Sequence, residues 1–316
     1  MWSILKSEPA PQRELNQRLK RIAKVFPIAP IVGQPSTAGD VVDYYEQCFE
    51  AYRHHHSAEG AVHMALNDGG RFDPDGFYGQ ARLLEQAWAQ TPAADVLELA
   101  FGQGFNLAYL APRMPGTRFS ALDLTPRHLA HVQALLQERG VANVALRLGD
   151  FHHLPYADAS FDHLFCIEGF CHASDPLRGL GEQARVLRPG GTMTLFDGYL
   201  TRPLSMLSTN EAMAIRLVAK GMAIERFQVI DELLEQARGV GLQPVTVTVL
   251  DAQIMPCLRR LERLTGTVLR LPWLGRRALA SRPPMRGRNV LAGYLMRCTV
   301  SLGLLGYRQL TLRKTS

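Results

Sequence analysis

The feature that most constrains the fold is a series of short apolar runs that alternate with helical patterns between residues 95 and 196. The apolar runs predict strands over residues 95–100, 118–124, 143–150, 161–168 and 191–196. Apolar positions recur at helical spacing in the stretches between them, over residues 104–111, 127–139 and 176–187. Strands that alternate with helices are typical of βαβ units, in which helices cover both faces of a parallel sheet. The pattern therefore predicts an α/β fold.

Further patterns flank this region on both sides. Helical spacing is visible over residues 13–25, where basic residues separate the apolar ones, and again over 41–52. A long helical region is expected over 211–239, followed by strands over 244–250 and 307–312. These expectations divide the chain into an N-terminal helical extension or lid (1–80), a core (81–250), a basic helical insertion (251–305) and a last core strand (306–316).

Length and composition limit the classes of protein that need be considered. With 316 residues, 47% of them hydrophobic, the chain can bury one large core or two. Five cysteines without a CxxC pair fit neither a disulfide framework nor a zinc site, so we expect a reducing compartment and no metal. There is no apolar run of signal-peptide length at the start, and the near-apolar stretch 290–306 is short for a membrane span. We expect a cytoplasmic protein, either soluble or peripheral on a membrane.

The net charge of +6 is distributed unevenly along the chain. Residues 252–316 contain twelve arginines, one lysine and a single acid, Glu262, which gives this segment a net charge of +12. Residues 1–251 therefore carry a net charge of −6. A basic segment on an acidic body favours an anionic partner such as phospholipid, a phosphorylated substrate or nucleic acid. A solvated surface that only keeps the chain soluble is an equal alternative.

Within the basic segment, apolar residues recur at helical spacing beside arginines: Leu258, Leu261, Leu264, Val268 and Leu269. Pro272-Trp273-Leu274 follows them. A cationic amphipathic helix with an adjacent Trp suits an anionic membrane surface, whereas the alternative is a cap that packs its leucines over an active site. The aromatic interleaving of single-strand nucleic-acid binders is missing, so nucleic acid is not an expected partner. A homodimer is compatible with the sequence.

A Gly-x-Gly turn follows the first predicted strand. Gly102 and Gly104 would let the backbone approach a bound ligand. The third glycine of the dinucleotide fingerprint is replaced by Leu107, which disfavours a nicotinamide cofactor. Glu98 precedes the turn. An acid at this position suits a cofactor that has a cationic amino-acid end and no phosphate. Asp123, at the end of the next strand, can accept both hydroxyl protons of a ribose.

Three later segments complete a known pattern: Gly149-Asp150-Phe151, the string LP…D.SFD over 154–162, and RVLRPGG over 185–191. With the glycine turn and Asp123, they resemble the class I S-adenosylmethionine-dependent methyltransferases over about residues 93–200. The resemblance implies a Rossmann-like fold, namely a mostly parallel seven-stranded sheet with helices on both faces, an N-terminal helical extension and a C-terminal helical insertion. It also implies S-adenosyl-L-methionine as the cofactor.

The same resemblance implies where each part of the cofactor binds. Glu98 and the glycine turn would hold the methionine part, Asp123 the ribose, and Asp150 with Phe151 the adenine. The complete set of cofactor-binding residues that we expect is Glu98, Ala100, Gly102, Gly104, Asn106, Asp123, Leu124, Asp150, Phe151 and Cys166.

A segment over residues 165–175, FCIEGFCHASD, carries the most specific indication of a substrate. It is similar to the IEATCHAP segment of sterol methyltransferases, which methylate an olefin in an isoprenoid-derived side chain. That family's aromatic YGWG segment has no counterpart here, and three histidines, His54–His56, stand near its place. The similarity implies a lipophilic small-molecule substrate, with carbon methylation of an isoprenoid, terpenoid or sterol-like olefin.

Methylation of a double bond creates a carbocation, which must be stabilised by aromatic rings or carboxylates and must then lose a proton to a base. Glu168 lies at the end of the fourth predicted strand, where open α/β sheets bind ligands, and is the first candidate for base or stabiliser. His172 is the second candidate. His63 and Tyr78 are expected to complete the wall of the catalytic site.

Several alternatives stay open at the level of sequence. The methyl acceptor could be an oxygen or nitrogen of an aromatic or quinone-type natural product. The chain could instead bind the cofactor at a membrane surface without catalysis. Glu168 could bind the amino group of the cofactor, and His54–His56 are better interpreted as a polar loop or lid than as a metal cluster, since three adjacent histidines cannot all face one ion.

Overall fold

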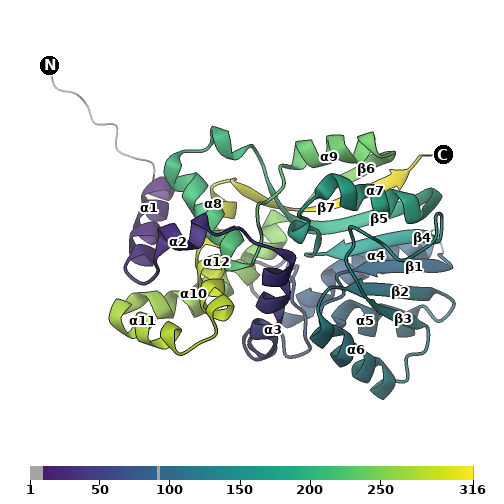
Figure 1. Cartoon of the computed structure of the whole chain (residues 1–316), viewed down its shortest axis with the longest axis horizontal. Coiled ribbons are helices and arrows are strands. Elements are labelled where there is room, and N and C mark those ends of the chain that lie inside the picture. Colours follow the sequence, from purple (N-terminus) through teal and green to yellow (C-terminus); the bar gives the residue numbers. More distant parts are fainter. Residues whose placement is uncertain (1–9, 91–92, 316) are drawn as a thin grey trace.

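The computed structural model describes residues 10–90 and 93–315, and a seven-stranded sheet lies at its centre (Figure 1). The strand order is β3-β2-β1-β4-β5-β7-β6. Strands β1 to β5 pair in parallel, whereas β7 is antiparallel to both β5 and β6. The strands are β1 (Asp95–Leu99), β2 (Arg118–Asp123), β3 (Val144–Leu148), β4 (Phe161–Ile167), β5 (Leu187–Leu200), β6 (Leu242–Val249) and β7 (Leu305–Lys314).

The mostly parallel seven-stranded sheet that the sequence predicted is confirmed, and helices cover both of its faces. The helices before β3 are α1 (Ala10–Ala23), α2 (Ile28–Gly33), α3 (Ala38–His55), α4 (Gly79–Gln90), α5 (Phe105–Arg113) and α6 (Pro126–Glu138). Those after β4 are α7 (Pro176–Val186), α8 (Thr209–Gly221), α9 (Ile230–Gly239), α10 (Asp251–Arg270), α11 (Pro272–Ala280) and α12 (Pro284–Ser301). Short 3-10 turns lie at Pro74–Tyr78, Phe170–His172 and Leu204–Met206.

Alternate residues of the central strands point to opposite faces, and both faces are buried. Val96 and Phe165 belong to the apolar cluster that α4, α5 and α6 cover. Leu97 and Leu164, their neighbours in sequence, belong to the cluster that α7 and α9 cover. This two-sided burial explains why the central strands have nearly continuous apolar sequences. Glu98 has the same parity as Val96 and therefore points toward α5.

Two of the expected elements differ from the structure. The single helical region expected over 211–239 is wrong, because α8 ends at Gly221 and α9 begins only at Ile230. Ala223, between them, has a φ of 56°, which a continuous helix does not allow. The strand expected over 191–196 is longer than predicted, since β5 pairs with β7 as far as Leu200. That pairing partner is more than a hundred residues away in sequence.

A second layer of helices lies beside the sheet, on the left in Figure 1. Helices α10, α11 and α12 lie between β6 and β7 in sequence, and α12 packs with α1 and α8 in one apolar cluster. Leu15 of α1 and Leu291 of α12 are both fully buried in this cluster. The N-terminal helix and the insertion therefore form one layer. No helix in the described part of the chain combines the length and apolar character needed to cross a bilayer.

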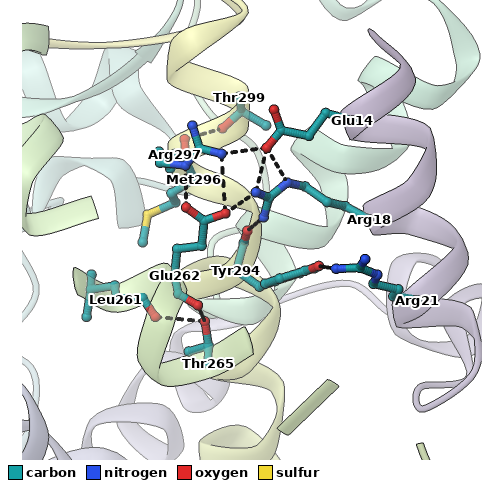
Figure 2. Close-up of polar contacts among 10 residues, drawn as sticks. All are labelled: Glu14, Arg18, Arg21, Leu261, Glu262, Thr265, Tyr294, Met296, Arg297 and Thr299. Atoms are coloured by element: carbon teal, nitrogen blue, oxygen red, sulfur yellow. Dashed lines mark hydrogen bonds and ion pairs between the residues drawn. The ribbon is translucent and has the colours of Figure 1, made fainter. Parts of the chain in front are cut away.

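A network of charged side chains joins three helices of this layer, α1, α10 and α12 (Figure 2). Arg18 of α1 pairs with Glu14 of its own helix and with Glu262 of α10. Arg297 of α12 pairs with the same two acids. Arg18 also donates to the backbone carbonyl of Tyr294 in α12 at 2.9 Å. Glu262, the single acid of the basic segment, therefore neutralises two arginines from different helices.

We predict that Glu262→Ala lowers the free energy of unfolding by about 2–4 kcal/mol, because it leaves Arg18 and Arg297 with one shared acid in a poorly hydrated position. The side chains of Arg18 and Glu262 are only 9% and 17% exposed. Urea denaturation followed by circular dichroism measures the change. The matched control is Glu14→Ala, whose side chain is 43% exposed and should contribute about 1 kcal/mol or less. Equal losses for the two variants would contradict this account.

Candidate active site

The turn between β1 and α5 brings the backbone close to neighbouring elements. Gly102 has a φ of 56° and Gly104 a φ of 78°, which are left-handed conformations that favour glycine. A Cβ on Gly104 would lie 2.7 Å from the side chain of Val132 in α6. One on Gly102 would lie 3.1 Å from Val62. Gly104 thus permits close helix packing, whereas Gly102 lines an adjacent cavity.

Asp123 is buried at the end of β2, and its carboxylate is fixed by three donors. It accepts from the backbone N–H groups of Gly102 at 2.9 Å and Thr125 at 2.8 Å. The ring Nδ1 of His128 lies 3.1 Å from the same carboxylate. These contacts hold Asp123 beside the glycine turn. His128 was not among the residues singled out from the sequence, because it belongs to α6 and carries no motif.

Glu98 is 1% exposed and only half satisfied. Its Oε1 accepts from Asn106 Nδ2 at 3.1 Å, whereas its Oε2 has no partner among the described residues. Burial raises the pKa of Glu98 to about 8; the hydrogen bond from Asn106 opposes the shift, and the charge of Asp123 adds to it. A buried carboxyl with a free oxygen is a suitable partner for a cationic ligand group.

A strand-end cavity with about 540 Å³ of empty space lies at the carboxyl ends of β1, β2 and β4. Six of the ten residues expected to bind the cofactor line it: Ala100, Gly102, Asp123, Leu124, Asp150 and Phe151. The other four, Glu98, Gly104, Asn106 and Cys166, lie outside its lining. Cys166 is buried, with its thiol 2.9 Å from where a Cβ on Gly169 would lie. Asp150 Oδ1 is hydrogen-bonded to Nδ1 of His152 at 2.6 Å, and Phe151 stacks near Phe170.

Glu168 lies directly after β4, with a φ of 52°. Its Oε1 accepts from the backbone N–H of Met64 at 2.6 Å. Burial raises the pKa of Glu168 to about 8; hydrogen bonds from Met64 and Tyr307 oppose the shift, and the charge of Asp197 adds to it. Glu168 lines the strand-end cavity and two further cavities, so it stands where all three meet.

His172 also lines the strand-end cavity. Its Nε2 lies 3.0 Å from the hydroxyl of Tyr45 in α3. Burial lowers the pKa of His172 to about 4, so the ring is neutral at physiological pH. Tyr45 makes edge contacts with both His172 and His128, and α3 therefore covers this cavity. Tyr45 lies in a helix that the sequence predicted, but it was not among the expected site residues.

The structure does not bring His63 and Tyr78 together with Glu168 and His172. His63 is buried, with Nε2 2.8 Å from the carbonyl of Phe77, and Tyr78 donates to Glu59. Neither residue is in the lining of the three cavities. Of the three adjacent histidines, His56 is buried against the carbonyl of His63 while His54 and His55 are exposed. Among the described residues, no group of three or more His, Cys, Asp or Glu side chains is arranged to hold a metal ion.

Two further cavities, both lined mainly by apolar residues, adjoin Glu168. The tyrosine cavity, with about 680 Å³ of empty space, is lined by Tyr44, Tyr45, Tyr52, Tyr307 and apolar residues of α10, α12 and β7. Asp197 also lines it, accepting from the backbone N–H of Cys171 at 2.8 Å, and burial raises the pKa of Asp197 to about 6. Asp197 directly follows the strand predicted over 191–196. Its position at the end of a predicted strand could have marked it as a candidate site residue. The helical cavity, with about 1160 Å³, lies between α3, α10 and α12.

Comparisons with known proteins agree with this geometry. A family profile described as a methyltransferase domain matches residues 97–195. Methyltransferase GfsG of Streptomyces halstedii is 29% identical over 222 residues, which cover 69% of this chain and 77% of GfsG. The 24-methylenesterol C-methyltransferase 2 of Oryza sativa subsp. japonica is 32% identical over 174 residues, which cover 55% of this chain and about half (47%) of that protein.

Among solved structures, the geranyl diphosphate C-methyltransferase of Streptomyces coelicolor A3(2) has a similar fold, with a TM-score of 0.64 at 14% identity. The superposition covers 86% of this chain and 98% of that one. At 14% identity this similarity supports the fold alone. The family profile and the sequence relatives support the methyltransferase activity. Together with the glycine turn, Asp123 and the strand-end cavity, they identify this chain as a class I S-adenosylmethionine-dependent methyltransferase.

Proposed function

We propose that the enzyme methylates a carbon–carbon double bond of a lipophilic isoprenoid, terpenoid or sterol-like substrate. The observation that carries the proposal is the position of Glu168, where the strand-end cavity meets the apolar tyrosine cavity. A cation that forms between these cavities would lie among tyrosine rings and two carboxyls, Glu168 and Asp197. The sterol methyltransferase relative methylates carbon, which supports the same acceptor atom.

Residues at the carboxyl ends of β1, β2 and β3 fit the three parts of the cofactor. The free Oε2 of Glu98 suits the methionine amino group, Asp123 the ribose hydroxyls, and Asp150 with Phe151 the adenine. When bound, the cofactor supplies an electrophilic methyl group and leaves as S-adenosylhomocysteine. The glycine turn lets the backbone approach the ligand, and α3 helps to exclude water through Tyr45 and His172.

The chain's own groups then complete the reaction on the substrate. The alkene carbon that gains the methyl group leaves its neighbour as a carbocation. The carboxylate of Glu168 accepts a proton from the adjacent carbon, and the remaining electron pair restores a double bond. His172, neutral and held by Tyr45, shapes the wall beside Glu168. A pKa of about 8 leaves part of Glu168 ionised near neutral pH and makes its carboxylate a stronger base than an ordinary glutamate.

Product analysis tests the acceptor atom directly. Purified enzyme with methyl-labelled S-adenosylmethionine and lipid extracts should yield a product in which the label resides on carbon. A label found only on oxygen or nitrogen would contradict carbon methylation and favour the aromatic or quinone-type alternative. Absence of any S-adenosylhomocysteine release would favour a non-catalytic binding protein.

We predict that Glu168→Gln lowers turnover of that substrate by ~10²–10⁴-fold, because the amide cannot accept the proton. The raised pKa of Glu168 means that the carboxylate fraction grows as the pH rises toward 8, so wild-type turnover should rise over the same interval. The variant should lose this pH dependence and bind the cofactor with nearly unchanged affinity. A variant with normal turnover, or one whose main defect is cofactor binding, would remove Glu168 from the proposed role.

A second prediction concerns Glu98. Because burial raises its pKa to about 8, the free enzyme holds Glu98 protonated at pH 7, and binding of a cationic amino group should release that proton. Affinity for S-adenosylmethionine should therefore increase between pH 6.5 and 8. Calorimetry in two buffers of different ionisation enthalpy measures the release. Glu98→Gln should abolish it and weaken binding by ~1–3 kcal/mol, the contribution of a charge-assisted hydrogen bond.

The matched control is Glu168→Gln, since Glu168 has a similarly raised pKa. That variant should release the proton as the wild type does. Proton release that disappears in Glu168→Gln and persists in Glu98→Gln would assign the amino group to Glu168 instead.

We further propose that the enzyme contacts an anionic membrane surface near the junction of α10 and α11. Large apolar side chains are 45–63% exposed there: Leu264, Leu271, Trp273 and Leu274. Exposed arginines are near them in the sequence, including Arg263, Arg270 and Arg277. Exposed apolar residues within a basic surface are typical of helices that lie at a lipid interface.

Co-sedimentation with vesicles tests this contact. Binding should require anionic lipid, fall as salt rises, and decrease at least severalfold in Trp273→Ser. The matched control is Leu177→Ser on α7, a 50% exposed apolar residue outside this surface, which should bind as the wild type does. Salt-insensitive binding, or an equal effect of both substitutions, would contradict the membrane contact.

A further inference from the structure

We propose that the helical cavity binds an anionic group of the substrate, a phosphate or carboxylate, through Arg282 and Arg286. The inference rests on the proposed function, because it concerns the same lipophilic substrate that reaches Glu168. It states which residues bind the end of that molecule distant from the reacting carbon. It narrows the substrate class to amphiphiles that carry an acidic group distant from the reacting carbon.

Both arginines line the helical cavity and have no acidic partner. Arg286 is half-buried and Arg282 exposed, and neither guanidinium makes an ion pair or hydrogen bond within residues 10–90 and 93–315. Several other partly buried arginines are paired with acids, such as Arg18 and Arg297 with Glu262. A half-buried guanidinium that lacks a partner is well placed to bind a carboxylate or phosphate through two parallel hydrogen bonds.

The surroundings of the two arginines are positive and polar. His55 and Asn289 line the cavity beside them. The pKa of His55 is lowered, first by partial burial and then by the positive charges of Arg286, His54, Arg282 and Arg260. Among the described lining residues, Glu168 is the only acid. An anion is therefore attracted to the arginines and repelled from the opposite part of the cavity once Glu168 is ionised.

The helical cavity is continuous with the proposed reaction site. Val62 and Glu168 line all three cavities, and Tyr52, Met64, Met222 and Met296 line both the helical and the tyrosine cavity. Because Arg282 is exposed while Glu168 adjoins the strand-end cavity, the arginines mark the outer end and Glu168 the inner end. Much of the remaining lining is apolar, including Leu261, Val268, Val290 and Met296. An amphiphile would thus enter tail first, with its acidic group held at the mouth.

Direct binding of simple amphiphiles tests the site without any methyl transfer. The probes are decyl phosphate and 1-decanol, titrated below their aggregation limits into the full chain with S-adenosylhomocysteine present. We expect decyl phosphate to bind about ten- to a hundredfold more tightly in calorimetry, as charge-assisted hydrogen bonds imply. The double variant Arg282→Gln/Arg286→Gln should bind the two probes with nearly equal affinity.

The matched control is Arg216→Gln/Arg226→Gln, which removes the same charge from exposed positions outside both the cavity lining and the proposed membrane surface. It should retain the preference for decyl phosphate, and circular dichroism should show both double variants folded. Equal affinities of the wild type for the two probes, or an equal loss in the control, would overturn the anion site. If the wild type methylates a neutral olefin but does not prefer decyl phosphate over 1-decanol, the anion site is refuted and the proposed function stands. If the wild type prefers decyl phosphate but methylates no carbon of any substrate, the proposed function is refuted and the anion site stands.

Discussion

The close approach of β1 and β4 at their carboxyl ends is the constraint on which the rest of the site depends. A Cβ on Gly169 would lie 2.5 Å from that of Ala100, so only glycine allows the two chain segments to leave the sheet side by side. Both strand ends turn through left-handed conformations, at Ala100 and at Glu168. Such conformations are costly for residues with a Cβ and are retained where the surrounding structure enforces them. Here they direct the glycine turn and the Glu168 carboxyl toward one cavity.

Charged side chains are paired in the helical layer, whereas two carboxyls beside the sheet are not. In the helical layer, Glu262 compensates Arg18 and Arg297, and the network joins helices from both ends of the chain. Beside the sheet, Glu98 is buried and Glu168 half-buried, neither has a cationic partner among the described residues, and desolvation raises the pKa of both to about 8. Uncompensated carboxyls reduce stability when ionised, and they are typical of sites in which a ligand supplies the missing charge.

The same helical layer forms the cover of the site. A capping box of Thr37 and Asp40 begins α3, and this helix carries Tyr45 to the strand-end cavity and Tyr52 to the two apolar ones. Helices α10 and α12 provide the opposite walls. The positions of these walls depend on packing against α1 and α8, since α12 contacts both in one apolar cluster. A change in the helical layer would therefore alter which molecules the cavities accept, without altering the glycine turn.

The amino-acid sequence by itself determined the α/β architecture, the glycine turn and Asp123, because strand and helix periods and short motifs depend on neighbouring residues. It also indicated Glu168, through a local segment after an apolar strand. Only the tertiary structure decided that His128 holds Asp123, that Tyr45 holds His172, and that His63 lies apart from the cavities. It also decided the break between α8 and α9 and the length of β5. Each of these features depends on contacts between residues far apart in the chain or on backbone geometry imposed by packing, and a local pattern carries no record of such contacts.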